Sequence, residues 1–225
     1  MSSLLPEYME KIKNEISSKI DEVINNRTIK SLSRDVFKRG LIDNKKKMGF
    51  HKKYLEITGK KEAIEIKKKF FSDFRHLYGL QYMDSGFIHK LERKKNEIIK
   101  LIGSCPFQAY EKYFHQAKIT EKECVKRKNL MSFFTKLSHT IHPKRCSAMD
   151  NQIKRYFGLR KEGFFFSYCL INESYLTWIK NNRPKLAMIK DIVRNLDAEN
   201  ALKISAVSDL KILDMIFWFK ANSQK

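Results

Sequence analysis

The chain has 225 residues, with 46 Lys and Arg against 25 Asp and Glu, and a formal net charge of +21. A hydrophobic content of 42% excludes a disordered tail, and 8 Gly and 4 Pro leave little material for a turn-rich β fold. No apolar run reaches the ~18 residues of a membrane helix, so we expect no membrane partner and no signal peptide. The charge favours a polyanionic partner, most commonly nucleic acid.

The first sixty residues predict a basic, helical N-terminal subregion. Residues 6–26 place Ile12, Ile16 and Ile20 on one helical face, and a shorter helix is expected over 28–40. Residues 44–61 form a basic, less regular connection. Its interleaved Phe50 and Tyr54 suit base and phosphate contacts, although an ordinary solvated loop or short helix is the slightly favoured interpretation.

Residues 61–225 predict a helical core. We expect helices over 61–79, over 85–103 with Asp84 or Ser85 as the cap, and over 106–118. Thr120 to Glu123 resembles a capping box, which predicts a further helix up to Pro143. Helices are also expected over 162–182, 183–196 and 208–222. No segment alternates as a hairpin would, so the fold class is all-α and multi-helix.

Cysteine usage indicates a reducing, cytoplasmic setting. The four cysteines are scattered and contain no CxxC pair. His139, His142 and Cys146 form an H-x2-H-x3-C pattern, but no second pair has ligand spacing, and a buried thiol with ordinary histidines is the simpler interpretation. We therefore expect no metal and no cofactor.

Asp150 is the acid on which the functional hypothesis depends. It stands at the start of an expected helix that Ser147 caps, and a first-turn acid is favoured there by the helix dipole alone. The surrounding positive charge gives it a second interpretation. An ionised carboxylate within a phosphate-binding surface stabilises the charge that develops on a sugar when a base departs.

The segment "AMDNQIKRYFGL" resembles the "(P)VDTHVxRxxxxLGL" segment of the helix-hairpin-helix DNA glycosylase superfamily, and the pattern over 120–222 is similar to its 8-oxoguanine branch. The resemblance implies an all-α, two-lobed fold and makes Asp150 the catalytic aspartate, with Asn151 and Gln152 as the polar pair and Arg155 one turn on. The family's "LxGVGxK[TS]" hairpin is missing here. Lys136 is the first choice for a Schiff-base amine, with Lys128 or no lysine as alternatives.

These observations predict a DNA N-glycosylase that removes a damaged or modified base, with or without lysine-dependent lyase activity, in repair or in defence against phage. It would act as a monomer on double-stranded DNA with the target base flipped out. The alternative is a non-enzymatic, helical nucleic-acid-binding protein. The residues expected to contact nucleic acid are Lys144, Arg145, Asn151, Gln152, Lys154, Arg155, Arg160, Lys161, His139 and His142.

Overall fold

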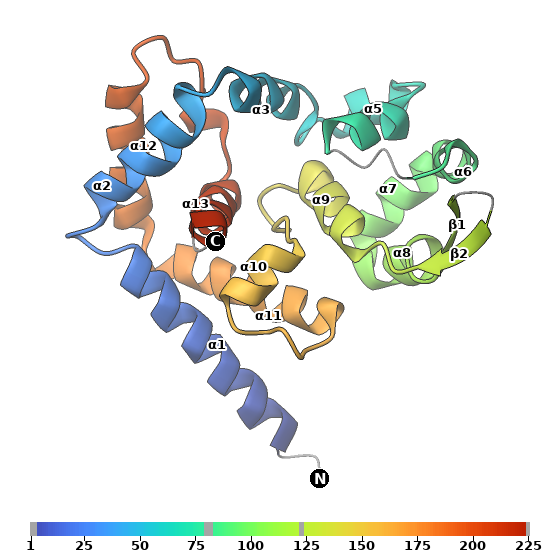
Figure 1. Cartoon of the computed structure of the whole chain (residues 1–225), viewed down its shortest axis with the longest axis horizontal. Helices are drawn as coiled ribbons and strands as arrows, with labels where there is room; N and C mark the ends of the chain where they lie inside the picture. Colours follow the sequence, from blue (N-terminus) through green and yellow to red (C-terminus); the bar gives the residue numbers. More distant parts are fainter. Residues whose placement is uncertain (1–3, 79–82, 122–123, 224–225) are drawn as a thin grey trace. The chain divides into compact units, whose positions relative to one another are not determined.

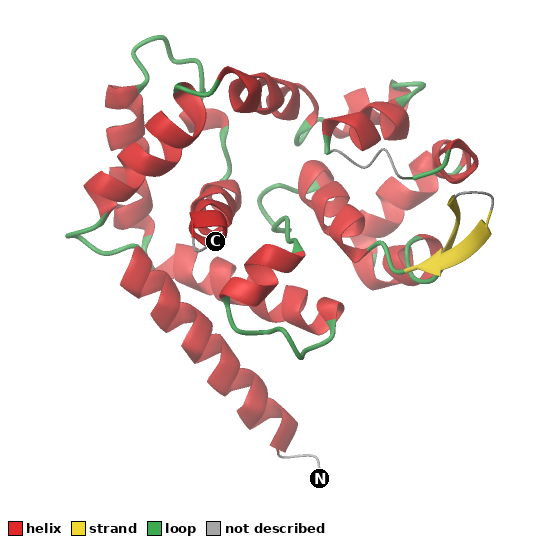
Figure 2. Cartoon of the chain, in the orientation of Figure 1, coloured by secondary structure: helices red, strands yellow, loops and turns green. Residues whose placement is uncertain are grey.

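The computed structural model describes residues 4–78, 83–121 and 124–223. Within these ranges the chain is helical apart from one short hairpin (Figure 2), which confirms the all-α, multi-helix fold. The chain divides into two compact units. Unit 1 comprises Met1–His51 and Lys144–Lys225, and unit 2 comprises Lys52–Pro143.

Unit 1 contains both ends of the chain. Its elements are α1 (Leu4–Val23), α2 (Ile29–Ser33), the π-helix η1 (Arg34–Ile42), the first half of α3 (Lys45–Ile57), α10 (Asn151–Tyr156), α11 (Phe164–Asn181), α12 (Arg183–Leu196), the 3-10 helix η2 (Ile204–Ala206) and α13 (Asp209–Ser223). The expected division at residue 60 differs from this one. The reason is that the long helix α1 packs along α11 instead of forming a separate N-terminal subregion (Figure 1).

The core of unit 1 follows from the predicted apolar face of α1 and from an aromatic cluster. Ile12, Ile16 and Ile20 are buried, as the helical spacing requires. Phe217 of α13 lies 5.0 Å from the Phe157 ring and 5.7 Å from the Tyr175 ring, measured between centroids. The cluster packs α10 against α13 and α11, so it fixes where the Asp150 segment lies within the unit.

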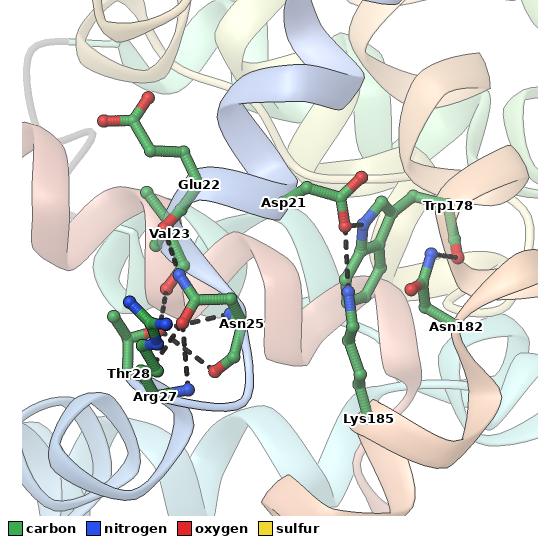
Figure 3. A network of polar contacts seen from close by, with 9 residues as sticks. All are labelled: Asp21, Glu22, Val23, Asn25, Arg27, Thr28, Trp178, Asn182 and Lys185. Carbon is green, nitrogen blue, oxygen red and sulfur yellow. Dashed lines mark hydrogen bonds and ion pairs between the residues drawn. The ribbon is translucent and has the colours of Figure 1, made fainter.

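A compact polar corner joins α1 to α2 (Figure 3). The Asn25 side-chain oxygen accepts hydrogen bonds from the backbone N–H groups of Arg27 and Thr28, at 3.0 and 3.1 Å. The Thr28 hydroxyl donates to the Val23 carbonyl at 2.7 Å. The Thr28 bond satisfies a carbonyl at the end of α1, and the Asn25 bonds hold the turn that leads into α2.

Unit 2 holds the remaining elements around a phenylalanine cluster. They are the second half of α3, α4 (Lys61–Ile66), α5 (Phe70–Leu77), α6 (Ser85–Arg93), α7 (Lys95–Ser104), α8 (Pro106–Tyr113), β1 (Ala117–Glu121), β2 (Cys124–Lys128) and α9 (Met131–Ile141). Phe133 of α9 lies 5.1 Å from the Phe74 ring and 5.6 Å from the Phe114 ring. The cluster joins α9 to α5 and to the end of α8.

Of the interpretations of 44–61, the helical one is confirmed and the irregular connection was wrong, because α3 occupies most of the segment. Met48, His51 and Tyr54 recur every third residue and are all buried, so the segment has a real inward helical face. Because lysines lie between these positions, the apolar periodicity of this helix is difficult to recognise in the sequence. Tyr54 therefore packs in the interior and does not reach a base or a phosphate.

The single long helix expected over 61–79 is two short helices, and Gly79 lies outside the described residues. The break follows from tertiary contacts. The Lys95 ammonium donates to the Lys67 carbonyl at 2.6 Å, and the Glu92 carboxylate accepts from the Phe71 backbone N–H at 2.6 Å, which caps α5. The helix expected over 85–103 is also two helices, α6 and α7, which meet at Lys94, and the predicted Asp84 cap is confirmed by its 2.8 Å bond from the Phe87 N–H.

The first part of the helix predicted from Thr120 was wrong, because β1 and β2 pair antiparallel there, whereas its second part is confirmed as α9, which ends before Pro143. Residues 122–123 of the supposed capping box lie outside the described residues. Two contacts close the base of the hairpin: Leu130 N–H donates to the Phe114 carbonyl at 2.9 Å, and Gln116 N–H donates to the Asn129 side chain at 2.9 Å. These contacts join residues 13 to 16 positions apart, and local propensity does not contain them.

Candidate functional site

Asp150 is the N-cap of α10. Its backbone is extended, and its Oδ1 accepts hydrogen bonds from the N–H groups of Gln152 and Ile153 at 2.9 and 3.0 Å. Ser147, the expected cap, is fully buried, and its N–H donates to the Asn172 side chain at 2.7 Å. The expectation that Ser147 caps this helix was therefore wrong, and Asp150 itself satisfies the free N–H groups.

Backbone hydrogen bonds cap the C-terminal end of α10. Gly158 adopts a left-handed φ of +81°, its N–H donates to the Arg155 carbonyl, and the Leu159 N–H donates to the Lys154 carbonyl. This is the Schellman arrangement, in which glycine avoids the steric cost of a Cβ. The Lys154 ammonium donates to the Glu162 carbonyl, so it holds the following loop in place. Lys154 is thus half-buried and structural, unlike its basic neighbours.

Five of the predicted phosphate-binding residues remain exposed around α10. We call them the α10 basic surface: Lys144, Arg145, Arg155, Arg160 and Lys161. In the part of the chain that the structure describes, none of these side chains forms an ion pair. Lysines elsewhere in the unit do pair with acids, for example Lys13 with Glu173. The α10 basic surface therefore presents positive charge that the fold does not neutralise.

The two predicted polar neighbours of Asp150 differ in their surroundings. Asn151 is exposed at the first position of α10, whereas Gln152 is half-buried. The Gln152 side-chain oxygen is buried and has no hydrogen-bond partner within residues 4–78, 83–121 and 124–223. A buried polar atom without a partner is costly and is typical of functional positions.

Lys136 and Lys128 belong to unit 2, whereas Asp150 belongs to unit 1. Lys136 lies on α9, with its ammonium 5.6 Å from the centre of the Tyr78 ring, a cation–π distance. Lys128 pairs with Ala117 across the hairpin.

His139 and His142, which were predicted to contact phosphate, also lie in unit 2. His139 is fully buried, and its Nε2 forms a 2.7 Å hydrogen bond with the Tyr54 hydroxyl while the two rings stack. An imidazole in that position joins α3 to α9 and is closed to a phosphate. His142 is half-buried at the C-terminal end of α9, which is the helix-ending role that histidine often has.

Sequence reasoning missed a cluster of ionisable groups in the core of unit 1. Lys211 and Asp214 of α13 form a 2.5 Å ion pair, with side chains only 11% and 7% exposed. Burial raises the pKa of the Tyr175 hydroxyl well above its usual range, and the charges of Asp214 and Asp150 act in the same direction. Among the described residues the Tyr175 hydroxyl has no hydrogen-bond partner. The available signal was the Lys-x-x-Asp spacing inside the apolar "LKILDMIFWF".

His51 belongs to the same cluster. Its ring forms a 2.8 Å hydrogen bond with the Leu202 carbonyl. Burial lowers the pKa of the His51 imidazole. The Leu202 carbonyl opposes that shift, Lys211 adds to it, and Asp197 opposes it. The Asp197 carboxylate accepts hydrogen bonds from the backbone N–H groups of Ala201 and Leu202, at 2.9 and 2.7 Å. The cluster therefore combines a neutral imidazole, a lysine and a carboxylate in the interior.

No group of three or more His, Cys, Asp or Glu side chains among the described residues is arranged to hold a metal ion. Burial raises the pKa of the Cys146 thiol, although Tyr168 and Arg145 oppose that shift, so this cysteine is a protonated, packed thiol. None of the described helices combines the length and apolar character needed to cross a bilayer.

Comparison of the chain with known protein families, with characterised proteins and with solved structures finds no match. The glycosylase resemblance of "AMDNQIKRYFGL" therefore stays a prediction, and functional inference depends on the residues described above.

Proposed function

We propose that this protein binds nucleic acid, with the α10 basic surface as a principal contact. The observation that carries the proposal is the exposure of five cations around one short helix without an acid paired to any of them in the described ranges. Since α10 has six residues, it is about 9 Å long. A DNA duplex presents one charge per ~1.7 Å of its axis, so several phosphates face a surface of this size.

A matched pair of double variants tests this proposal. Arg155→Gln with Arg160→Gln removes two unpaired cations, whereas Arg39→Gln with Arg194→Gln removes two exposed arginines of the same unit that pair with Asp35 and Asp191. Both proteins lose the same formal charge. Fluorescence anisotropy with a labelled DNA duplex at 0.05 to 0.3 M salt compares their affinities.

The α10 variant is expected to bind about tenfold more weakly at 0.1 M salt and to lose about 2 from the slope of log K against log salt, since each phosphate contact contributes ~0.9. The control should keep most of the wild-type slope. Equal losses in both variants would show that only net charge matters, and no binding by the wild-type protein would overturn the proposal.

N-glycosidic bond cleavage is the second candidate, with Asp150 as the carboxylate that stabilises charge at C1′. Two features favour it. Both helix N–H groups bind Oδ1 of Asp150, so within the described part of the chain no hydrogen bond occupies Oδ2. The partnerless Tyr175 hydroxyl lies within electrostatic range of the same carboxylate. In this reaction water, or a lysine amine, attacks C1′ as the bond to the base breaks.

The glycosylase candidate is tested by incubating wild-type protein and Asp150→Asn with duplexes that contain modified bases, followed by cleavage at abasic sites. The expected result is strand breaks with wild type alone and equal DNA binding by both. Breaks with neither protein on any substrate would remove the candidate and leave nucleic-acid binding intact. Borohydride trapping of wild type and of Lys136→Gln and Lys128→Gln variants shows whether either lysine is the amine.

A further inference from the structure

The β1–β2 hairpin has one face whose composition packing does not explain. Its register places Lys118 opposite Arg127 and Thr120 opposite Val125. Since alternate residues of a strand share a face, Lys118, Arg127 and Val125 lie together on one face of the ribbon. Lys118 and Arg127 are both exposed, and the Val125 side chain is 68% exposed. The opposite face begins with Ala117, which is buried.

The facing pair of cations is unfavourable for the hairpin itself. Directly opposed residues of an antiparallel pair have Cβ atoms about 4.5–5.5 Å apart, and like charges at that distance repel. Neither Lys118 nor Arg127 forms an ion pair with any residue of the described ranges; Arg127 reaches only the Gln116 side-chain oxygen, at 3.5 Å. A pair that costs stability and is not neutralised internally is explained by an anionic partner.

Val125 adds an exposed apolar group to this face. An exposed β-branched residue gains nothing from packing in the described structure. Cations on one side of an exposed apolar group suit a surface that presents phosphates at its rim and sugars and base edges in its interior. A groove of duplex nucleic acid has that arrangement.

We propose that this hairpin face inserts into the major groove of duplex DNA, with Lys118 and Arg127 on phosphates and Val125 against base edges. The inference rests on the proposed nucleic-acid binding and adds a second contact on the other unit. The major groove of B-DNA is ~12 Å wide and admits a two-stranded ribbon, whereas the major groove of A-form RNA is too narrow. The hairpin therefore predicts a preference for DNA duplexes over RNA duplexes.

The test uses the full-length chain and three variants. Lys118→Gln with Arg127→Gln removes the facing cations, and Lys60→Gln with Lys100→Gln removes two other exposed cations of the same unit. Val125→Ala removes the apolar group alone. Binding to 16-base-pair DNA and RNA duplexes of matched sequence is measured by anisotropy across a salt series, and thermal unfolding is measured for each protein.

The facing-cation variant is expected to lose about 2 from the salt slope and about tenfold in affinity for DNA, with an unfolding midpoint at or above that of wild type because repulsion is relieved. The Lys60 and Lys100 control should bind within about threefold of wild type. Val125→Ala should weaken DNA binding with an unchanged salt slope.

The outcomes separate this inference from the broader one. If wild type binds DNA but the facing-cation variant matches the control, the hairpin contact is overturned and the proposed function stands. Equal affinity for DNA and RNA duplexes, with equal losses in the variants, overturns insertion into the major groove. Absence of any duplex binding by wild type overturns both.

Discussion

The indole N–H of Trp178 donates to Asp21 Oδ1 at 3.0 Å, and the Lys185 ammonium donates to the same oxygen at 2.9 Å (Figure 3). One carboxylate of α1 thereby holds the end of α11 and the start of α12. Lys185 also lies 5.6 Å from the centre of the Trp178 ring. Asp21 thus takes part in polar contacts between α1 and α11, as does Glu173, which pairs with Lys13.

Trp178→Phe is expected to lower the free energy of unfolding of unit 1 by about 1–2 kcal/mol, because it removes a hydrogen bond to a charged acceptor and part of a buried ring. Lys185→Gln should cost less, since one partner of that ion pair is half exposed. Urea denaturation followed by fluorescence suits both variants: the chain's other tryptophan, Trp218, is in unit 1 as well. Equal losses would contradict the importance given to the indole bond.

The buried pair of Lys211 and Asp214 gives a larger expected effect. Asp214→Ala removes the carboxylate that pairs with Lys211 in the interior and should cost about 3–5 kcal/mol. Replacing both residues, as Lys211→Met with Asp214→Leu, should cost much less, because no unpaired charge remains. Asp191→Ala breaks the exposed pair with Arg194 and should change stability by at most about 0.5 kcal/mol. The comparison uses urea midpoints at neutral pH.

His51 predicts a pH dependence of stability. Its pKa is lowered in the folded state, mainly by burial, so near and below pH 6.5 the unfolded chain binds a proton that the folded chain does not. The stabilisation is therefore fully present above pH 6.5 and is lost as the pH falls towards the folded pKa. Unfolding free energies at pH 7.5 and pH 5.5 should differ more for wild type than for His51→Gln. Identical differences would mean that other groups set the dependence.

The Asp150 cap has a stability effect that separates it from catalysis. Asp150→Ala should destabilise unit 1 by about 1 kcal/mol, whereas Asp150→Asn and Asp150→Ser retain an acceptor and should stay within about 0.5 kcal/mol of wild type. Loss of base release in Asp150→Asn at unchanged stability would then be a chemical effect. If Asp150→Ala were as stable as wild type, the two observed cap bonds would contribute nothing.

Sequence patterns predicted well the elements whose signal is local. The apolar spacing of α1, the boundaries of α12 at 183 and 196, and the Asp84 cap all follow from residues a few positions apart. Asp150 was correctly placed at a helix start, although the cap is Asp150 itself and not Ser147.

The elements that the sequence did not predict depend on contacts between distant residues. The hairpin closes through Leu130 and Phe114, and the break between α4 and α5 is held by Lys95 and Glu92. The pairing of Tyr54 with His139, 85 residues apart, likewise places a candidate histidine in the interior. Single-residue propensity contains none of these pairings, which is why the burial of His139 could not be predicted from the sequence.

The discontinuity of unit 1 has a consequence for synthesis of the chain on the ribosome. All of unit 2 leaves the ribosome before Lys144 does. Unit 2 can therefore fold before the synthesis of α11, the helix against which α1 packs. Until then Ile12, Ile16 and Ile20 present an uncovered apolar stripe on an otherwise charged helix. We expect the nascent chain to depend on chaperone protection of this stripe until residue 181 has left the exit tunnel, and α1 to acquire protection from proteolysis last.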